Sequence, residues 1–286
     1  NIGFLLVVPG RFMDVEHIRR LLYKKPEDII SQIKNDFSMV LNLLLSQTPE
    51  DIRNIFENSF AMYQHTYRIK KRDELDESRD LWEDFLKHLH FLRAEGFVNE
   101  HYRLTENGSW ASKLRLDQPL LIAECLKQKV FPTDNEKLLA AMIAPFVYDG
   151  DQNVKITGKK LSRKLTRTYN RVLSTLRPLS ERMKAAGFST SPLYLWTSAV
   201  IYDWARGVDW DEIIINAGIS DGDMAMLVLR TADNLRQIAS LKETHPEMAA
   251  LAVKARESIL EKIGYLPRYF PVKNVWSDFE KLKRTK

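Results

Sequence analysis

The sequence predicts a mostly α-helical protein with one small β-hairpin between two helical parts. Apolar residues recur three and four positions apart along most of the 286 residues, which is the spacing of helices packed on a core. One stretch, 97–111, instead has the short pattern of a hairpin around an Asn-Gly pair. Downstream of Pro119 no convincing strand pattern remains.

Composition and cysteine content exclude several classes of protein. Hydrophobic residues make up 44% and charged residues 28%, which is ordinary globular composition and excludes collagen and low-complexity chains. No apolar run reaches the roughly 20 residues of a membrane span. Cys125 is the one cysteine, which excludes an internal disulfide or a multi-cysteine zinc site and fits a reducing, cytoplasmic compartment. The net charge of +5 mildly favours an anionic partner.

The first element is a pattern typical of a buried strand, residues 2–8, closed by Pro9-Gly10. The rest of the sequence offers no comparable strands for it to join. We therefore expect residues 1–26 to be the remnant of a sheet-containing domain, and this sequence to be a fragment of a larger protein.

The segment 27–116 predicts a set of helices followed by the hairpin. Thr48-Pro49 and the two acids after it are a helix start signal, and Gly96 ends the last helix. Charge-dense residues 67–78 indicate a linker. In order, the predicted helices span 26–37, 39–45, 49–63 and 81–92.

The hairpin is predicted from two short strands, 97–104 and 109–111, joined through Asn107-Gly108. Two or three helices followed by a small hairpin is the outline of a winged-helix domain, in which the hairpin is the wing. The alternative is a generic α+β fragment.

The segment 117–286 predicts an all-α helical bundle. Each helix carries apolar residues at helical spacing, and several begin at Pro, Asp or Ser. The predicted helices span 119–129, 134–148, 158–186, 193–206, 209–217, 221–241 and 246–262.

Sequence motifs for catalysis are missing. Gly158-Lys159 is the one Gly-Lys pair, and it lacks both the upstream Gly and the following Ser or Thr of a phosphate-binding loop. An acidic D-E-x-[DH] box is also absent. We therefore predict no catalytic, cofactor-binding or metal-binding residues here, and we expect the chain alone not to hydrolyse ATP.

A run of positive charge is the first candidate binding feature. Residues 155–184 contain ten basic residues and one acid, Glu181. Five of these form a stripe on one side of the predicted helix: Lys160, Arg163, Lys164, Arg167 and Arg171. A solvated helix face normally mixes signs, because like charges repel. The stripe therefore favours nucleic-acid binding, and an ordinary solvated face is the alternative.

The predicted helix 221–241 carries the second feature. Asp223, Arg230 and Gln237 are spaced by seven residues, so they lie along one line on a polar flank. That line presents an arginine and hydrogen-bonding groups to a ligand that runs along the helix. A plain polar face, or a structural ion pair from Arg230 to an acid elsewhere in the bundle, are the alternatives.

Several segments together resemble the C-terminal portion of Ski-type superfamily-two DExH helicases, which are ATP-driven RNA helicases that feed substrates to the exosome. The resemblance covers most of residues 14–261. The matching segments are 39–44 and 58–64 in the winged helix, and Tyr202-Asp203-Trp204-Ala205-Arg206-Gly207, Ile213, 220–223 and 230–237 in the helical bundle.

The resemblance implies a division of the chain into three parts. Residues 1–26 would be the end of the second RecA-like domain, and residues 27–116 the winged helix, with the family's arch reduced to a short linker near 67–78. Residues 117–286 would be the ratchet helical bundle. ATP and Mg²⁺ would bind in RecA-like domains of the parent helicase, outside this chain.

The resemblance also implies residue roles. Arg230 falls on the family's RNA-contacting arginine of the ratchet helix. Residues 146–149 fall on a segment that ends near an acidic RNA contact, and Gly150 separates Asp149 from Asp151, so either aspartate is a candidate.

The function we predict is therefore the nucleic-acid-gripping region of a cytoplasmic helicase that translocates on and unwinds RNA or DNA. Its expected partners are a single strand, the RecA-like domains of the parent and RNA-decay proteins. Two other classes stay open: a winged-helix nucleic-acid-binding regulator, and a helical protein-interaction scaffold that binds no nucleic acid.

Overall fold

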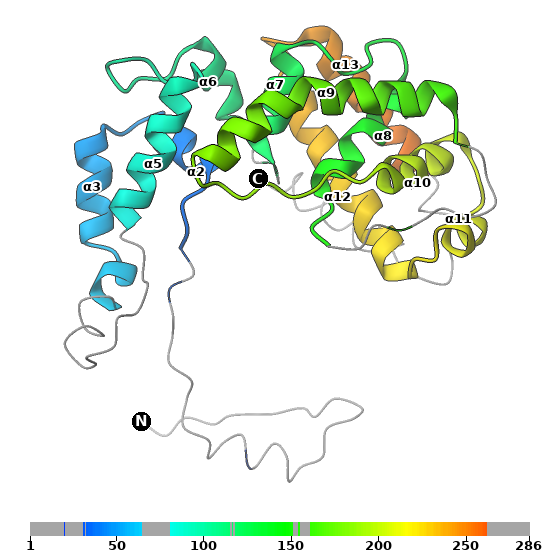
Figure 1. Cartoon of the computed structure of the whole chain (residues 1–286), viewed down its shortest axis with the longest axis horizontal. Coiled ribbons are helices and arrows are strands. Elements are labelled where there is room, and N and C mark those ends of the chain that lie inside the picture. Colours follow the sequence, from blue (N-terminus) through cyan, green and yellow to red (C-terminus); the bar gives the residue numbers. More distant parts are fainter. Residues whose placement is uncertain are drawn as a thin grey trace, which may run out of the picture. The chain divides into compact units, whose positions relative to one another are not determined.

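The computed structural model describes residues 20, 31, 33–64, 81–114, 116, 118–150, 154 and 161–261, and it divides into two compact units. The described residues of 35–54 and 79–286 form the larger unit, and those of 1–34 and 55–78 form the smaller one. The helices are α2 (Phe37–Leu43), α3 (Pro49–Glu57), α5 (Leu81–Ala94), α6 (Glu106–Ala111), α7 (Pro119–Lys127), α8 (Glu136–Val147), α9 (Arg163–Ala185), α10 (Leu195–Arg206), α11 (Trp210–Ala217), α12 (Asp221–Ala239) and α13 (Pro246–Leu260) (Figure 1).

Helix α8 is the centre of the larger unit. Every residue from Leu138 to Val147 is buried, as expected for a helix that is apolar all round. It packs against α9, α10, α12 and α13, so its neighbours surround it (Figure 1). The prediction of an all-α bundle in this part of the chain is confirmed for the described residues.

Two tryptophans fix the neighbours of α8 to one another. The Trp204 indole N–H donates to the Ile259 carbonyl at 2.8 Å, which ties α10 to α13. The Trp210 indole N–H donates to the Asp221 carboxylate at 2.9 Å, which ties α11 to the start of α12. Buried indole N–H groups need such partners, so both contacts fix the position of the helices as well as their packing.

The predicted hairpin is wrong in its position. Thr105 has extended backbone, and its hydroxyl accepts from the Gly108 N–H, which starts helix α6 where the turn and second strand were expected. The chain reverses earlier, around Asn99, whose side chain accepts from the backbone of His101 and Arg103. Among the described residues the β-structure is one isolated bridge between Val98 and Leu104.

Gly108 has a different role from the hairpin turn that the Asn-Gly pair predicts. A Cβ atom at Gly108 would lie 2.0 Å from the Phe97 carbonyl oxygen. The glycine therefore permits a close backbone approach between α6 and the segment after α5, and its place is not a hairpin turn.

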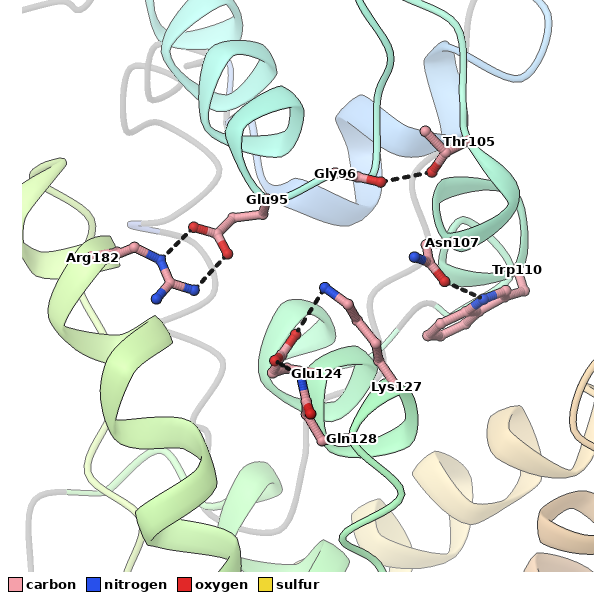
Figure 2. Close-up of polar contacts among 9 residues, drawn as sticks. All are labelled: Glu95, Gly96, Thr105, Asn107, Trp110, Glu124, Lys127, Gln128 and Arg182. Carbon is pink, nitrogen blue, oxygen red and sulfur yellow. Dashed lines mark hydrogen bonds and ion pairs between the residues drawn. The ribbon is translucent and has the colours of Figure 1, made fainter.

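The end of α5 is held to α9 by a paired arginine and carboxylate. Arg182 donates two hydrogen bonds of 2.7 Å to Glu95, whose side chain is only 8% exposed (Figure 2). The Glu95 carboxylate raises the pKa of the Arg182 guanidinium. Nearby on α7, Glu124 accepts from Gln128 and faces Lys127 (Figure 2).

The helix prediction for residues 26–37 is wrong at its described end. Residues 33–36 are not helical, because Asp36 has extended backbone and caps α2 by accepting from the Met39 N–H. Helix α3 begins at Pro49 as predicted, but it ends at Glu57, before the predicted end at residue 63.

Several expectations lie outside the described residues. They are the strand at 2–8, the reduced arch at 67–78, Asp151 and Lys160. Within the described residues, every helix is too short or too polar to cross a membrane.

Candidate nucleic-acid interface

The structure brings together two of the residues predicted to contact nucleic acid. Arg230, in the middle of α12, donates to the Asp149 carboxylate at 2.8 Å, just beyond the end of α8. Asp149 is 80% exposed and Arg230 is 27% exposed, so the pair lies at the surface. The hydrogen bond from Arg230 lowers the pKa of Asp149.

This contact is an ion pair from Arg230 to an acid elsewhere in the bundle, which is the structural alternative predicted for this arginine. Because the pair is exposed, its contribution to folding stability is small: surface ion pairs contribute only about 0–1 kcal/mol. The acid involved is also itself a predicted contact residue. The pair therefore orients the Arg230 guanidinium at the surface without making the fold depend on it.

Aromatic side chains stand next to this pair. Tyr148 precedes Asp149 and packs edge-on against Tyr194 and Trp196, with ring centroids 5.8 and 4.8 Å away. Tyr148 and Tyr194 are each partly exposed, whereas Trp196 is buried. Tyrosines beside an arginine supply faces on which bases can stack. Nothing in the sequence marks Tyr194, because its proximity to Tyr148 depends on how α10 packs on α8.

Asp223 and Gln237 lie on the same flank of α12 as Arg230, with different surroundings. Asp223 forms a capping box with Ser220: its carboxylate accepts from the Ser220 hydroxyl and N–H, and its own N–H donates to the Ser220 hydroxyl. Asp223 therefore has a structural task at the start of the helix. Gln237 is partly exposed near the other end.

The described part of the basic stripe lies on α9, whose opposite side is buried through Leu165, Val172 and Leu176. Arg163, Lys164 and Arg167 are exposed. Arg171 differs, because its guanidinium donates to the Val130 carbonyl at 2.7 Å and fixes the loop after α7. Helix α9 packs on α7, α8 and α10, whereas α12 packs on α8, α10 and α13, so the two predicted features belong to separate surfaces.

Metal-ligating side chains and Cys125 are the remaining reactive groups to place among the described residues. No group of three or more His, Cys, Asp or Glu side chains in this part of the chain could hold a metal ion. Cys125 is buried on α7. Its burial raises the pKa of its thiol well above the usual value, and the nearby Glu124 raises it further. A thiol in that environment is not a nucleophile.

Residues 101–264 match the model of the DSHCT (NUC185) domain. The matched range includes α6 to α13, and with them Arg230, Asp149, Tyr148 and Tyr194.

Two curated relatives are similar over a comparable stretch. The DExH-box ATP-dependent RNA helicase DExH15, chloroplastic, of Arabidopsis thaliana is 25% identical over 186 residues, 62% of this chain and 16% of its own length. The antiviral helicase SKI2 of Saccharomyces cerevisiae is 21% identical over 184 residues, 59% of this chain and 14% of its own length. The chain thus spans only a small part of these relatives. Since the domain model covers more than half of the chain, the chain belongs to the DSHCT domain family, whose members are found in Ski2-like DExH helicases.

Proposed function

We propose that this chain is the strand-gripping region of a Ski-type RNA helicase. Arg230 would hold a single RNA strand against the surface formed by α12 and the end of α8. The observation that carries the proposal is the exposed Arg230–Asp149 pair, flanked by Tyr148 and set within a DSHCT domain.

Each group at this surface has a use in binding a strand. A guanidinium can fork onto a phosphate or stack on a base, and the phenol ring of Tyr148 can stack on a neighbouring base. Asp149 accepts hydrogen bonds, so it can release Arg230 to a phosphate and accept from a ribose hydroxyl. A surface ion pair is weak enough for a phosphate to replace the carboxylate.

The parent helicase would supply the remaining chemistry. ATP and Mg²⁺ would bind its RecA-like domains, which are also the expected intramolecular partners, and RNA-decay proteins are the expected external ones. DNA in place of RNA, and the cytoplasm as compartment, stay predictions; one relative is named as chloroplastic. The winged helix also stays a proposal, with the Val98–Leu104 bridge as a minimal wing.

The test is strand binding by the full chain, measured as fluorescence anisotropy of a labelled single-stranded RNA. Arg230→Ala should weaken binding roughly 10- to 100-fold, because a charge-assisted hydrogen bond contributes about 1.5–3 kcal/mol. The affinity of Arg230→Lys should lie between those of the wild type and Arg230→Ala, since lysine keeps the positive charge and loses the two-pronged hydrogen bonding of the guanidinium. The thermal midpoint should stay near that of wild type.

Arg236→Ala is the matched control, because Arg236 lies on the same helix, is more exposed, and pairs with Asp233 at 2.7 Å. It removes the same charge, and we expect less than a twofold effect on binding. Equal losses in the two variants would contradict the grip by Arg230, and so would a large loss of stability in Arg230→Ala with binding intact.

A further inference from the structure

Two basic residues in the C-terminal half of helix α9 have acidic partners, whereas three exposed ones in its N-terminal half have none among the described residues. In the C-terminal half, Arg182 forms its double bond with Glu95, and Arg177 lies 3.8 Å from Glu181. In the N-terminal half, the side chains of Arg163, Lys164 and Arg167 form no ion pair or hydrogen bond with the described residues, and all three are exposed. We call these three residues the basic face of α9.

The basic face is unfavourable to the fold in isolation. Arg167 lies three residues after Lys164 and four after Arg163, so its charge repels both of theirs. They also occupy the first turns of the helix, whose N-terminal end carries the positive part of the helix dipole. Helices α11 and α12 have acids in the first turn, and α9 has none.

A ligand with regularly repeated negative charge would offset both the repulsion among the three cations and their unfavourable interaction with the helix dipole. The face spans more than one helical turn, presents three cations in a row, and has the aliphatic side of α9 buried beneath it, so it cannot turn away. A phosphate backbone fits this pattern better than a single anion does, because successive phosphates can each meet one cation.

We propose that Arg163, Lys164 and Arg167 form a second, sequence-independent contact with the phosphates of the RNA strand, on a surface separate from the Arg230 site. The inference rests on the proposed function. Arg171 takes no part, since its guanidinium is held by the Val130 carbonyl.

The experiment measures the salt dependence of RNA binding by the full chain. The test variant is Arg163→Ala/Lys164→Ala/Arg167→Ala. The control variant, Arg177→Ala/Lys184→Ala/Lys242→Ala, changes the net charge by the same amount and uses exposed residues elsewhere, two of them on α9. Each protein is titrated with labelled oligo(U) and oligo(A) between 50 and 200 mM salt.

The test variant should lower the slope of log affinity against log salt by about 2, at about 0.7 for each lost phosphate contact. Wild-type affinity would then fall roughly 20-fold more than that of the test variant across this salt range. The loss should be equal for the two sequences, because phosphate contacts carry no base information. The control slope should stay near that of wild type.

Thermal melting is a second measurement, in which the melting temperatures of the test and control variants should shift in opposite directions. The test variant should melt at or above the wild-type temperature, because it removes repulsion and an unfavourable dipole interaction. The control should melt slightly lower, because it removes Lys184 from the last turn of α9, where a cation is favourable.

Each result separates this inference from the proposed function. A slope that is unchanged in the test variant, or lowered equally in the control, would overturn the basic face alone. A poly-glutamate peptide that competes with RNA as well as unlabelled RNA does would also overturn it, in favour of an acidic protein partner. A lower salt slope in the test variant, together with unchanged RNA binding by Arg230→Ala, would support the basic face and contradict the proposed contact by Arg230. A wild-type chain that binds no RNA would overturn both.

Discussion

Gly108→Ala should destabilise the larger unit by about 2–3 kcal/mol, although alanine is the better helix former. The added methyl group would lie 2.0 Å from the Phe97 carbonyl oxygen, and that atom belongs to the backbone, so a side-chain rotation cannot relieve the clash. Overpacking of this kind typically costs about 1–3 kcal/mol, and the backbone contact places the expected loss in the upper part of that range. Urea unfolding followed by circular dichroism measures it.

Two other glycines serve as controls for Gly108. Gly222, in the first turn of α12, has no atom nearer to its added Cβ than the Ser220 hydroxyl at 3.7 Å, so Gly222→Ala should stabilise by about 0.4–1 kcal/mol. Gly96 has a φ of +78° with open space around it, so Gly96→Ala should show conformational strain alone, about 1–2 kcal/mol. A Gly108→Ala variant as stable as wild type would contradict α6 and favour the hairpin.

Arg182→Ala should destabilise the larger unit by about 2 kcal/mol. Glu95, whose side chain is 8% exposed beside Arg182, would lose both hydrogen bonds to its carboxylate. Breaking a fully buried pair costs about 3–5 kcal/mol, and we expect less here because Arg182 is 51% exposed and water can partly replace it.

The reverse change tests the same physical account. Glu95→Ala leaves the half-exposed Arg182, which water solvates readily, so it should cost about 1 kcal/mol or less. Urea unfolding of both variants and of the double variant gives the coupling between the two side chains. Equal losses in the two single variants would show that the burial of Glu95 does not control the effect.

Helix boundaries in the bundle could be predicted from the sequence where the signals are local. Helix α12 begins at Asp221 because Ser220 and Asp223 form a capping box within four residues. Helices α10 and α11 end at Gly207 and Gly218, both with positive φ, as glycines after a helix commonly do. These ends depend on neighbouring residues alone, and the predictions lie within two residues of the structure.

The errors depend on contacts between residues far apart in the chain or on competing local signals. The close approach of Gly108 to Phe97 is invisible in the Asn-Gly pair, which favours a turn when read alone. Helix α2 begins only after Asp36, because that residue caps it. The apolar pattern through Ile33 and Phe37 instead favoured one continuous helix across this position.

The candidate site could be predicted only in part. The exposed flank of α12 follows from helical spacing, and the charge of α9 is plain in the sequence. The pairing of Arg230 with Asp149, 81 residues away, and the position of Tyr194 beside Tyr148 follow from how α8, α10 and α12 pack. The separation of Arg171 from the rest of the stripe likewise depends on the Val130 carbonyl.

Photo-crosslinking is the most direct test of the central claim, that RNA lies along α12 and the end of α8. The full chain would be irradiated with an oligonucleotide containing 4-thiouridine, and the crosslinked peptides would be identified by mass spectrometry. We predict crosslinks in peptides that contain Tyr148 and Arg230, and their loss in Arg230→Ala but not in Arg236→Ala. Crosslinks confined to α6 or α13, or unchanged in Arg230→Ala, would contradict the account.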